Sequence, residues 1–338
     1  MVPEILFLKQ EDVIQAGLLD MKKILEATEK TFRLLGEGKV SNPPKVQLRM
    51  PEMDADDWDS YCMSMPSYIG GDEDVVGFKW ASEAKANPSK GLPYGVDIVV
   101  LSDPHTVFPK AILDGTITTA MRTSAAAGVM AKYNARKNSK VAALFGAGVI
   151  GRTMIMAMME VLPGLETIYM VDLDEKKAQA LADEFKGTYH VVPCTDAQTA
   201  LKDADVVVTE TTAAKPFLKK EWIKSNATVI QMEAASYEED VLTGADKIFV
   251  DNWAQLSHYN GTLEGKLYHE GRLNQEDVVE MPQMVVENLG RENDDEFIFC
   301  GTLGVGSVDI LIANMLYKEA QKLGLGTKLT LWDNPLWV

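Results

Sequence analysis

Residues 139–172 read SKVAALFGAGVIGRTMIMAMMEVLPGLETIYMVD, and this stretch decides the fold. It contains an apolar run at 141–145 with the length of a buried strand. Glycines follow at once, and residues 152–161, rich in Met and Ala and free of Gly and Pro, are typical of a helix. A second apolar run at 167–171 predicts the next strand. The order of strand, glycine turn, helix and strand is that of one β-α-β unit.

The glycine turn has the G-x-G-x-x-G spacing, with Gly146, Gly148 and Gly151. The first glycine permits a tight turn, the second lets a pyrophosphate approach the backbone, and the third lets helix and strand pack closely. The helix N-terminus at Val149 and Ile150 offers free N–H groups to phosphate oxygens. Such a turn alone is weak evidence, but here the flanking strand and helix are both present. We therefore predict a dinucleotide site.

An acidic residue follows the second strand at the position that reads the ribose. Asp172 lies 21 residues beyond Gly151, where a carboxylate accepts hydrogen bonds from the adenosine ribose hydroxyls. Its charge would repel a 2′-phosphate, so the sequence favours NAD over NADP. Two alternatives stay open: Asp172 merely ends a strand, or Asp174 shares or replaces its role.

Short apolar runs separated by polar segments continue the alternation beyond this unit. Strands that are apolar on both faces belong in a covered, largely parallel sheet. The further strand candidates are 190–192, 206–209, 228–231 and 248–250.

The regions on either side of this pattern read differently. Residues 20–36 have helical spacing, whereas 75–80 and 96–101 read as strands with prolines and glycines between them. Near the other end, 308–323 has the pattern of an amphipathic helix closed by Gly324. The sequence thus predicts an α/β protein in which a Rossmann domain accompanies an α+β domain.

The composition limits the classes of function. A length of 338 residues suggests about two domains. With 33 basic and 50 acidic residues the formal charge is −17, which repels phosphate backbones and anionic lipid, so we expect no nucleic-acid or membrane partner. No run of about 18 residues is both apolar and uncharged, and we expect a cytoplasmic protein. Three cysteines and four histidines show no ligand spacing, so no metal is expected.

Two cations interrupt apolar surroundings outside the dinucleotide pattern. Lys79 ends a strand candidate, and Arg122 lies in TTAMRTSA at 118–125. A cation on a mostly buried element is costly unless it meets an anion, and a substrate carboxylate would serve. A structural salt bridge is the competing interpretation for either residue.

Several separated segments together resemble the ornithine cyclodeaminase and mu-crystallin family, which includes amino-acid dehydrogenases and ketimine reductases. The motifs keep their order and approximate spacing on both sides of the glycine turn, and the likeness spans nearly the whole chain. They are 65–68, 77–80, Asn87 with 91–93, 101–103, 111–115, 118–126, 204–209, 249–251, and Gly304, Asp309 and 324–327.

The resemblance implies a particular domain arrangement. Residues 1–118 and 304–338 are expected to build a substrate-binding and dimerisation domain, into which a Rossmann NAD-binding domain of 119–303 is inserted. Homodimers are usual in the family. The partners implied are thus a small-molecule amino or imino acid and a second copy of the chain.

The resemblance also assigns site residues. It implies that Lys79 and Arg122 face the nicotinamide and hold the substrate carboxylate, as catalytic and substrate-binding residues. A further family arginine corresponds to Lys45 or, after a slip, to Arg49, and Met65 is a candidate lining residue that would equally suit a core. The expected cofactor-binding residues, by their place in the matched segments, are Thr123, Gly146, Gly148, Val149, Ile150, Gly151, Asp172 and Thr209.

One departure from the family bears on the reaction. Ornithine cyclodeaminases carry an aspartate in a glycine-rich loop after the fifth Rossmann strand, where this chain reads QMEAASYEED at 231–240. Glu233 is a possible substitute, since its carboxylate reaches one methylene further. The leading hypothesis is therefore an NAD-dependent oxidoreductase acting on the C–N bond of a small amino or imino acid. The alternatives are an ornithine cyclodeaminase-type ammonia lyase using bound NAD⁺ and an NAD(H)-dependent ligand carrier resembling mu-crystallin.

Overall fold

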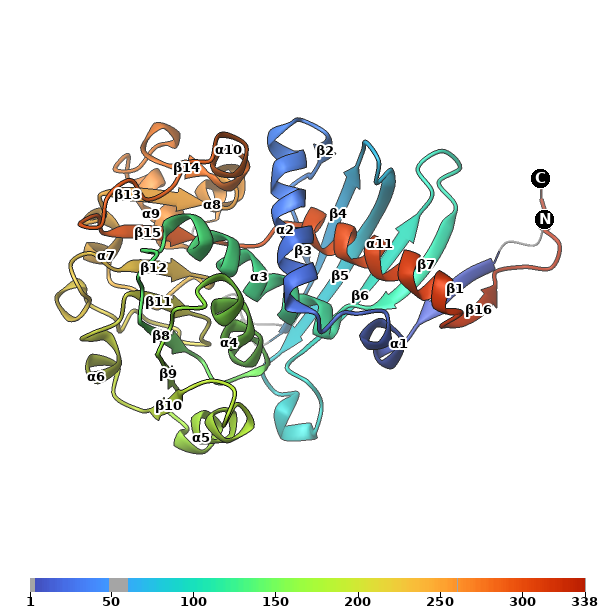
Figure 1. The fold of residues 1–338 in the computed structure, drawn as a ribbon. Coiled ribbons are helices and arrows are strands. Elements are labelled where there is room, and N and C mark those ends of the chain that lie inside the picture. The colour runs from blue at the N-terminus through green and yellow to red at the C-terminus, as the bar shows by residue number, and fades with distance from the viewer. Residues whose placement is uncertain (1–3, 49–59, 260, 338) are drawn as a thin grey trace. The chain divides into compact units, whose positions relative to one another are not determined.

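The computed structural model describes residues 4–48, 60–259 and 261–337. The chain divides into two compact units, drawn in Figure 1. Unit 1 comprises Met1–Arg122 and Val305–Val338, and unit 2 comprises Thr123–Gly304. The limits predicted from the sequence, after residues 118 and 303, lie four residues and one residue before these limits. Helix α3 (Thr116–Asn134) runs through the first limit without a break, so no change of pattern marks where one unit ends.

Unit 2 is built on a parallel sheet. The strand order is β10-β9-β8-β11-β12-β15-β13-β14, and every neighbouring pair is parallel, which confirms the predicted Rossmann-type α/β fold. The strands are β8 (Val141–Phe145), β9 (Thr167–Val171), β10 (Val191–Cys194), β11 (Val206–Thr209), β12 (Thr228–Gln231), β13 (Lys247–Val250), β14 (Val279–Glu280) and β15 (Ile298–Gly301). The helices are α4 (Val149–Val161), α5 (Glu175–Glu184), α6 (Ala197–Leu201), α7 (Glu239–Thr243), α8 (Trp253–His258), α9 (Leu263–His269) and α10 (Met281–Glu287).

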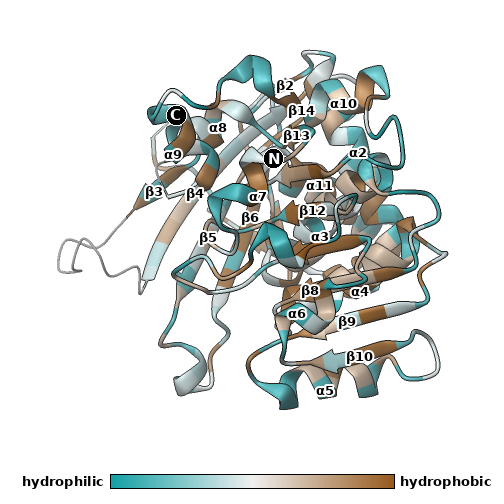
Figure 2. Cartoon of the chain, turned by 90° about the vertical axis from the view of Figure 1, so that its left-hand side faces the viewer, coloured by the Kyte–Doolittle hydropathy of each residue, from teal (hydrophilic) through white to brown (hydrophobic). Residues whose placement is uncertain are grey.

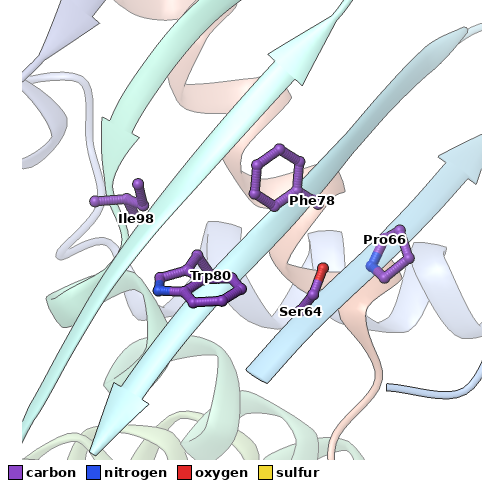
Figure 3. A pocket seen from close by; sticks show the side chains of 5 residues that line it. All are labelled: Ser64, Pro66, Phe78, Trp80 and Ile98. Atoms are coloured by element: carbon purple, nitrogen blue, oxygen red, sulfur yellow. The ribbon is translucent and has the colours of Figure 1, made fainter. Parts of the chain in front are cut away.

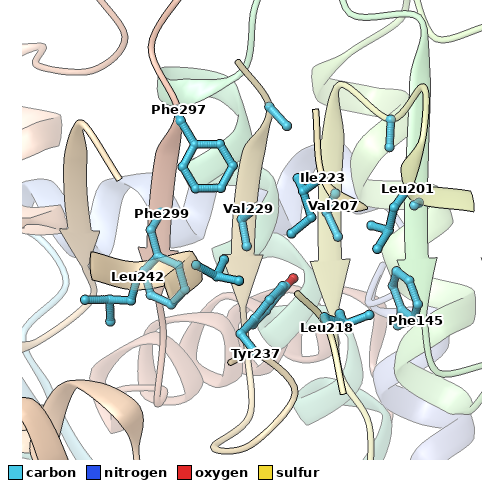
Figure 4. Close-up of a cluster of buried hydrophobic side chains, with 14 of the residues drawn as sticks. Phe145, Leu201, Val207, Leu218, Ile223, Val229, Tyr237, Leu242, Phe297 and Phe299 are labelled. Atoms are coloured by element: carbon cyan, nitrogen blue, oxygen red, sulfur yellow. The ribbon is translucent and has the colours of Figure 1, made fainter. Parts of the chain in front are cut away.

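The core of unit 2 includes a cluster of apolar side chains from neighbouring strands. Phe145, Val207 and Val229 come from successive strands of the sheet, and Figure 4 shows Tyr237 and Phe299 packed beside them. The rings of Tyr237 and Phe299 meet edge to face with centroids 6.0 Å apart. Figure 2 shows the corresponding apolar colouring along β8 and mixed colouring along α5. This rigid sheet fixes the positions of the loops that follow its strands.

Unit 1 is built on a largely antiparallel sheet. Its order is β16-β1-β7-β6-β5-β4-β2, with β3 also paired to β4, and only β1 and β7 run parallel among the described pairs. The strands are β1 (Glu4–Leu8), β2 (Val40–Ser41), β3 (Val46–Leu48), β4 (Ser60–Ile69), β5 (Val75–Ala84), β6 (Gly95–Ser102), β7 (Pro109–Asp114) and β16 (Thr327–Thr330). The helices are α1 (Gln10–Gln15), α2 (Met21–Gly36) and α11 (Gly306–Leu323).

The two faces of this sheet have different partners. Helix α11 packs against β4, β5 and β6 on one face, where Lys79 and Ala81 of β5 are buried. Phe78 and Trp80 alternate to the other face, as the pleat requires. Figure 3 shows them beside Ile98 of β6, with α11 behind the sheet. An apolar hollow of about 550 Å³ lies on this open face.

Candidate functional site

The glycine turn of unit 2 has the geometry that its sequence requires. Gly146 has φ of 105°, and a Cβ placed there would lie 2.1 Å from the carbonyl oxygen of Glu210. A Cβ on Gly151 would lie 2.1 Å from the carbonyl oxygen of Gly146, so the helix and the turn are in direct contact. By contrast, apart from its chain neighbours, no atom of the described chain lies within 4 Å of a Cβ built on Gly148. The turn is therefore tightly packed at Gly146 and Gly151 and open at Gly148, which is where a pyrophosphate would approach.

Asp172, the residue after β9, stabilises this turn through a hydrogen bond. Its Oδ2 accepts a hydrogen bond from the Ala147 N–H at 2.8 Å, and its Oδ1 accepts one from the Asp174 N–H at 2.9 Å. Asp174 instead caps helix α5 by accepting a hydrogen bond from the Lys176 N–H at 3.1 Å. Both acids therefore accept backbone hydrogen bonds, and Asp172, which contacts the glycine turn itself, is the one that we expect at an adenosine ribose.

Removing the charge of Asp172 is expected to relax the choice of cofactor. Asp172→Asn keeps an acceptor for the Ala147 N–H but no longer repels a 2′-phosphate, so the ratio of kcat/KM for NADPH to that for NADH should rise about tenfold. The matched control is Asp174→Asn, which should leave that ratio unchanged. An unaltered ratio in the Asp172 variant would exclude it as the discriminating residue.

Thr209 and Glu233 meet at the carboxyl edge of the unit 2 sheet. Thr209 is the buried last residue of β11, and its Oγ1 donates a hydrogen bond to Oε1 of Glu233 at 3.0 Å. Burial raises the pKa of Glu233, while hydrogen bonds from Ser236 and Thr209 act in the opposite direction. Ligands of open α/β sheets bind beyond the carboxyl ends of the strands, so this pair lies at the appropriate edge. Thr123, also predicted to bind cofactor, is the half-buried first residue of unit 2.

Lys79 forms a buried ionic cluster within unit 1. Only 1 % of the residue is exposed, and its Nζ lies 3.1 Å from Oδ1 of Asp309 and 3.8 Å from Oδ2 of Asp97. Nζ also donates a hydrogen bond to Oγ1 of Thr119 at 3.3 Å. Burial, followed by the nearby charge of Arg122, lowers the pKa of Lys79. A lowered pKa makes the ammonium group a stronger proton donor, which suits a general acid.

Arg122 shares the same carboxylate oxygen. Its Nε donates to Oδ1 of Asp309 at 3.1 Å, so the two predicted cations are both paired to one aspartate. Both residues therefore form a salt bridge with a protein acid, which neither assigns nor excludes a second interaction with a substrate carboxylate. Within the described chain the two Nη groups of Arg122 donate to no protein group, and the guanidinium therefore retains a fork of N–H donors. The two cations, Lys79 and Arg122, carry the same formal charge as the two acids, Asp309 and Asp97, with the opposite sign. A bound substrate carboxylate would therefore add one uncompensated negative charge.

Of the remaining predicted substrate residues, Met65 and Lys45 belong to the described chain. Met65 is buried in β4 directly across from Lys79 in the strand register. It therefore packs beside the lysine stem. Lys45 is half-buried immediately before β3, and Arg49 lies outside the described residues.

Sequence reasoning did not assign a role to the acids of the cluster. Asp309 was noted only as part of a motif, and Asp97 and Thr119 were not singled out. A usable signal was present, since Asp309 interrupts the apolar helix run VDILI and Asp97 interrupts VDIVV. A buried carboxylate needs a partner for the same reason that a buried cation does.

Neither a metal-binding group of side chains nor a membrane-spanning helix is present among the described residues. No group of three or more His, Cys, Asp or Glu side chains there is arranged to hold a metal ion. No helix in the described chain combines the length and apolar character needed to cross a bilayer.

Known proteins are similar to this chain over nearly its whole length. Residues 4–323 match the family model described as ornithine cyclodeaminase/mu-crystallin family. An alanine dehydrogenase from Archaeoglobus fulgidus is 32% identical over 335 residues, covering 96% of this chain and 98% of that protein. The structure of Thermococcus litoralis Delta(1)-pyrroline-2-carboxylate reductase with NADH and L-proline is 29% identical, with a TM-score of 0.87 over 96% of this chain and 100% of that one.

A second solved structure adds the state of assembly in a relative. An archaeal alanine dehydrogenase dimer with bound NAD is 29% identical and superposes with a TM-score of 0.87, covering 97% of this chain and 100% of that chain. The glycine turn, the paired cations and these matches together lead to one conclusion: the chain belongs to the ornithine cyclodeaminase/mu-crystallin family.

Proposed function

We propose that this protein is an NAD-dependent oxidoreductase that acts on the C–N bond of a small amino or imino acid. The similar proteins include an alanine dehydrogenase and a pyrroline-2-carboxylate reductase, and each of these names refers to an amino or imino carboxylic acid. In this chain the proposal depends chiefly on one observation, which is that Asp309 holds Arg122 through Nε and leaves its Nη groups to bind a carboxylate. The glycine turn and Asp172 supply the residues that would hold NAD.

Each residue of the candidate site has a separate role in the proposed reaction. Arg122 binds the substrate carboxylate through two parallel N–H donors and so fixes the position of the neighbouring carbon. Lys79 has a lowered pKa and passes a proton to the substrate nitrogen, or accepts one from water that attacks an imine. Asp309 and Asp97 keep both cations in place. The nicotinamide, when bound, carries the hydride.

The test of this function is a panel of α-amino acids with NAD⁺ and of cyclic and ammonia-derived imino acids with NADH. We expect NADH consumption equal to the amount of amine formed. Release of ammonia from a diamino acid without net change in NADH would show cyclodeamination instead. Binding of an imino acid with no conversion under either condition would show a carrier.

We also propose that the protein forms a homodimer through the open face of the unit 1 sheet. Apolar side chains gather there although no helix of the described residues covers them, and Ile98 is 42% exposed among them. A contiguous apolar face of this kind is typical of an interface, and the archaeal relative is a dimer.

A charge on that face is expected to separate the subunits. Ile98→Glu should give a monomer by light scattering at concentrations where the wild type is a dimer, because burying a carboxylate in an apolar interface is costly. Val286→Glu, at a residue 44% exposed on α10, is the matched control and should remain dimeric. A dimer unaffected by the Ile98 change would place the interface elsewhere.

A further inference from the structure

Glu264 is a buried acid without a hydrogen-bond partner. It lies in the first turn of α9 with 0% of its surface exposed. Neither carboxylate oxygen forms a hydrogen bond with any residue of the described chain. An ionised carboxylate in that state would be strongly unfavourable, so the side chain must carry a proton or meet a positive charge.

The fold leaves space for the Glu264 side chain at the edge of the unit 2 sheet where its strands have their C-terminal ends. A Cβ on Gly301, at the end of β15, would lie 1.9 Å from Oε1 of Glu264, so the carboxyl occupies the space that a larger residue there would need. Gly301 pairs with Gln231 of β12 and with Val250 of β13. Glu233 follows Gln231 by two residues. The Glu264 carboxyl therefore lies at the edge where β12 ends.

The charges that act on Glu264 are negative. Its pKa is raised to about 7, chiefly by burial and further by the charges of Asp251 and Glu233, while its own backbone N–H acts in the opposite direction. Asp251, after β13, accepts hydrogen bonds from the Leu303 and Gly304 N–H groups at 2.8 and 2.6 Å. No cation of the described chain is among the groups that shift Glu264.

The other titratable groups nearby remain neutral around pH 7. Burial raises the pKa of Tyr237, whose ionisation Glu233 also disfavours, and burial raises the pKa of Cys300 in β15. On α9 itself Lys266 is engaged at the surface with Glu239, 3.1 Å away. Burial raises the pKa of Glu233 as well, and the pKa of Glu264 is raised to about 7, so the Glu264 carboxyl can exchange a proton near neutrality.

We propose that Glu264 is a positioning residue for the oxidised cofactor, because its buried carboxyl, which has no cationic partner in the described chain, releases its proton when NAD⁺ binds and keeps it when NADH binds. This inference rests on the proposed function, since it requires that the dinucleotide lies along the carboxyl edge of this sheet. The nicotinamide ring of NAD⁺ is cationic and that of NADH is neutral. A positive ring favours the ionised form of Glu264, and by linkage the ionised form favours the positive ring. The released proton goes to the solvent.

The experiment is calorimetric titration of the whole protein with NAD⁺ and, separately, with NADH, in two buffers of different ionisation enthalpy at pH 7. We expect a substantial fraction of one proton to be released per NAD⁺ bound and none per NADH. The ratio of NADH to NAD⁺ dissociation constants should rise about tenfold from pH 6 to pH 8. Glu264→Gln should abolish both effects, whereas the isosteric control Glu239→Gln, at a surface ion pair, should change neither.

The possible results separate this inference from the proposed function. If neither form of the dinucleotide binds, the proposed function fails and this inference with it. If NAD⁺ binds without proton release, the wild-type titration alone overturns the role of the Glu264 carboxyl and leaves the oxidoreductase intact. Proton release that persists in Glu264→Gln overturns the role of Glu264.

Discussion

Lys79→Met is expected to lower kcat/KM by about a thousandfold, the range in which a positioned general acid acts. Met has nearly the length of the lysine stem, so the packing against Met65 is kept while the Nζ is lost. The change also leaves Asp309 and Asp97 with one cation fewer and should reduce the free energy of unfolding by about 3 kcal/mol. Steady-state kinetics and urea unfolding measure the two effects separately.

A double variant distinguishes catalysis from charge balance. Lys79→Met combined with Asp97→Asn removes one positive and one negative charge, so Arg122 and Asp309 again balance. Stability should recover substantially in this variant, but activity should not. If turnover returned together with stability, Lys79 would serve only to neutralise the aspartates, and the proton-transfer role would have to be abandoned.

Arg122→Met should also lower kcat/KM by about a thousandfold, with most of the loss in KM. Two charge-assisted hydrogen bonds to a carboxylate are worth about 4 kcal/mol together. Asp309 keeps Lys79 as a partner in this variant, so the loss of stability should be smaller than for Lys79→Met. The measurement is kcat and KM for the best substrate of the panel.

A substrate without the carboxylate provides the specific control for Arg122. Wild type and Arg122→Met should convert a cyclic imine lacking that group equally slowly, because the lost interaction is absent for both. Arg152→Met, which removes an exposed arginine paired with Glu184, should leave KM unchanged. An Arg122 variant that still discriminates between the two imines by the wild-type factor would contradict carboxylate binding by this residue.

The strands of the parallel sheet were predictable because each is a short apolar run bounded by polar or glycine residues. The limits of β8, β9, β11 and β12 agree with the runs identified in the sequence. Strand β15 was missed, since it enters the sheet between β12 and β13, out of chain order. Strand β5 extends beyond the predicted Trp80 to Ala84, because its later residues are held by pairing with β4 rather than by apolar character.

The cations of the candidate site were visible in the sequence, but their partners were not. Lys79 and Arg122 stood out as charges within apolar runs. Their common acid, Asp309, is 187 residues beyond Arg122, and only the packing of α11 on the unit 1 sheet brings it to them. Glu264 likewise had no local signal, because its burial depends on the absence of a side chain at Gly301. Contacts of this kind are set by tertiary structure, which local patterns do not encode.

The most direct measurement follows the hydride itself. NADH carrying deuterium at the transferred position of C4 is incubated with the protein and the imino acid that the panel identifies, and the product is analysed by mass spectrometry and NMR. The account predicts one deuterium on the carbon that bears both nitrogen and carboxylate, with one NAD⁺ formed per product. A product free of deuterium, or ammonia released without any NAD⁺ formed, would contradict it.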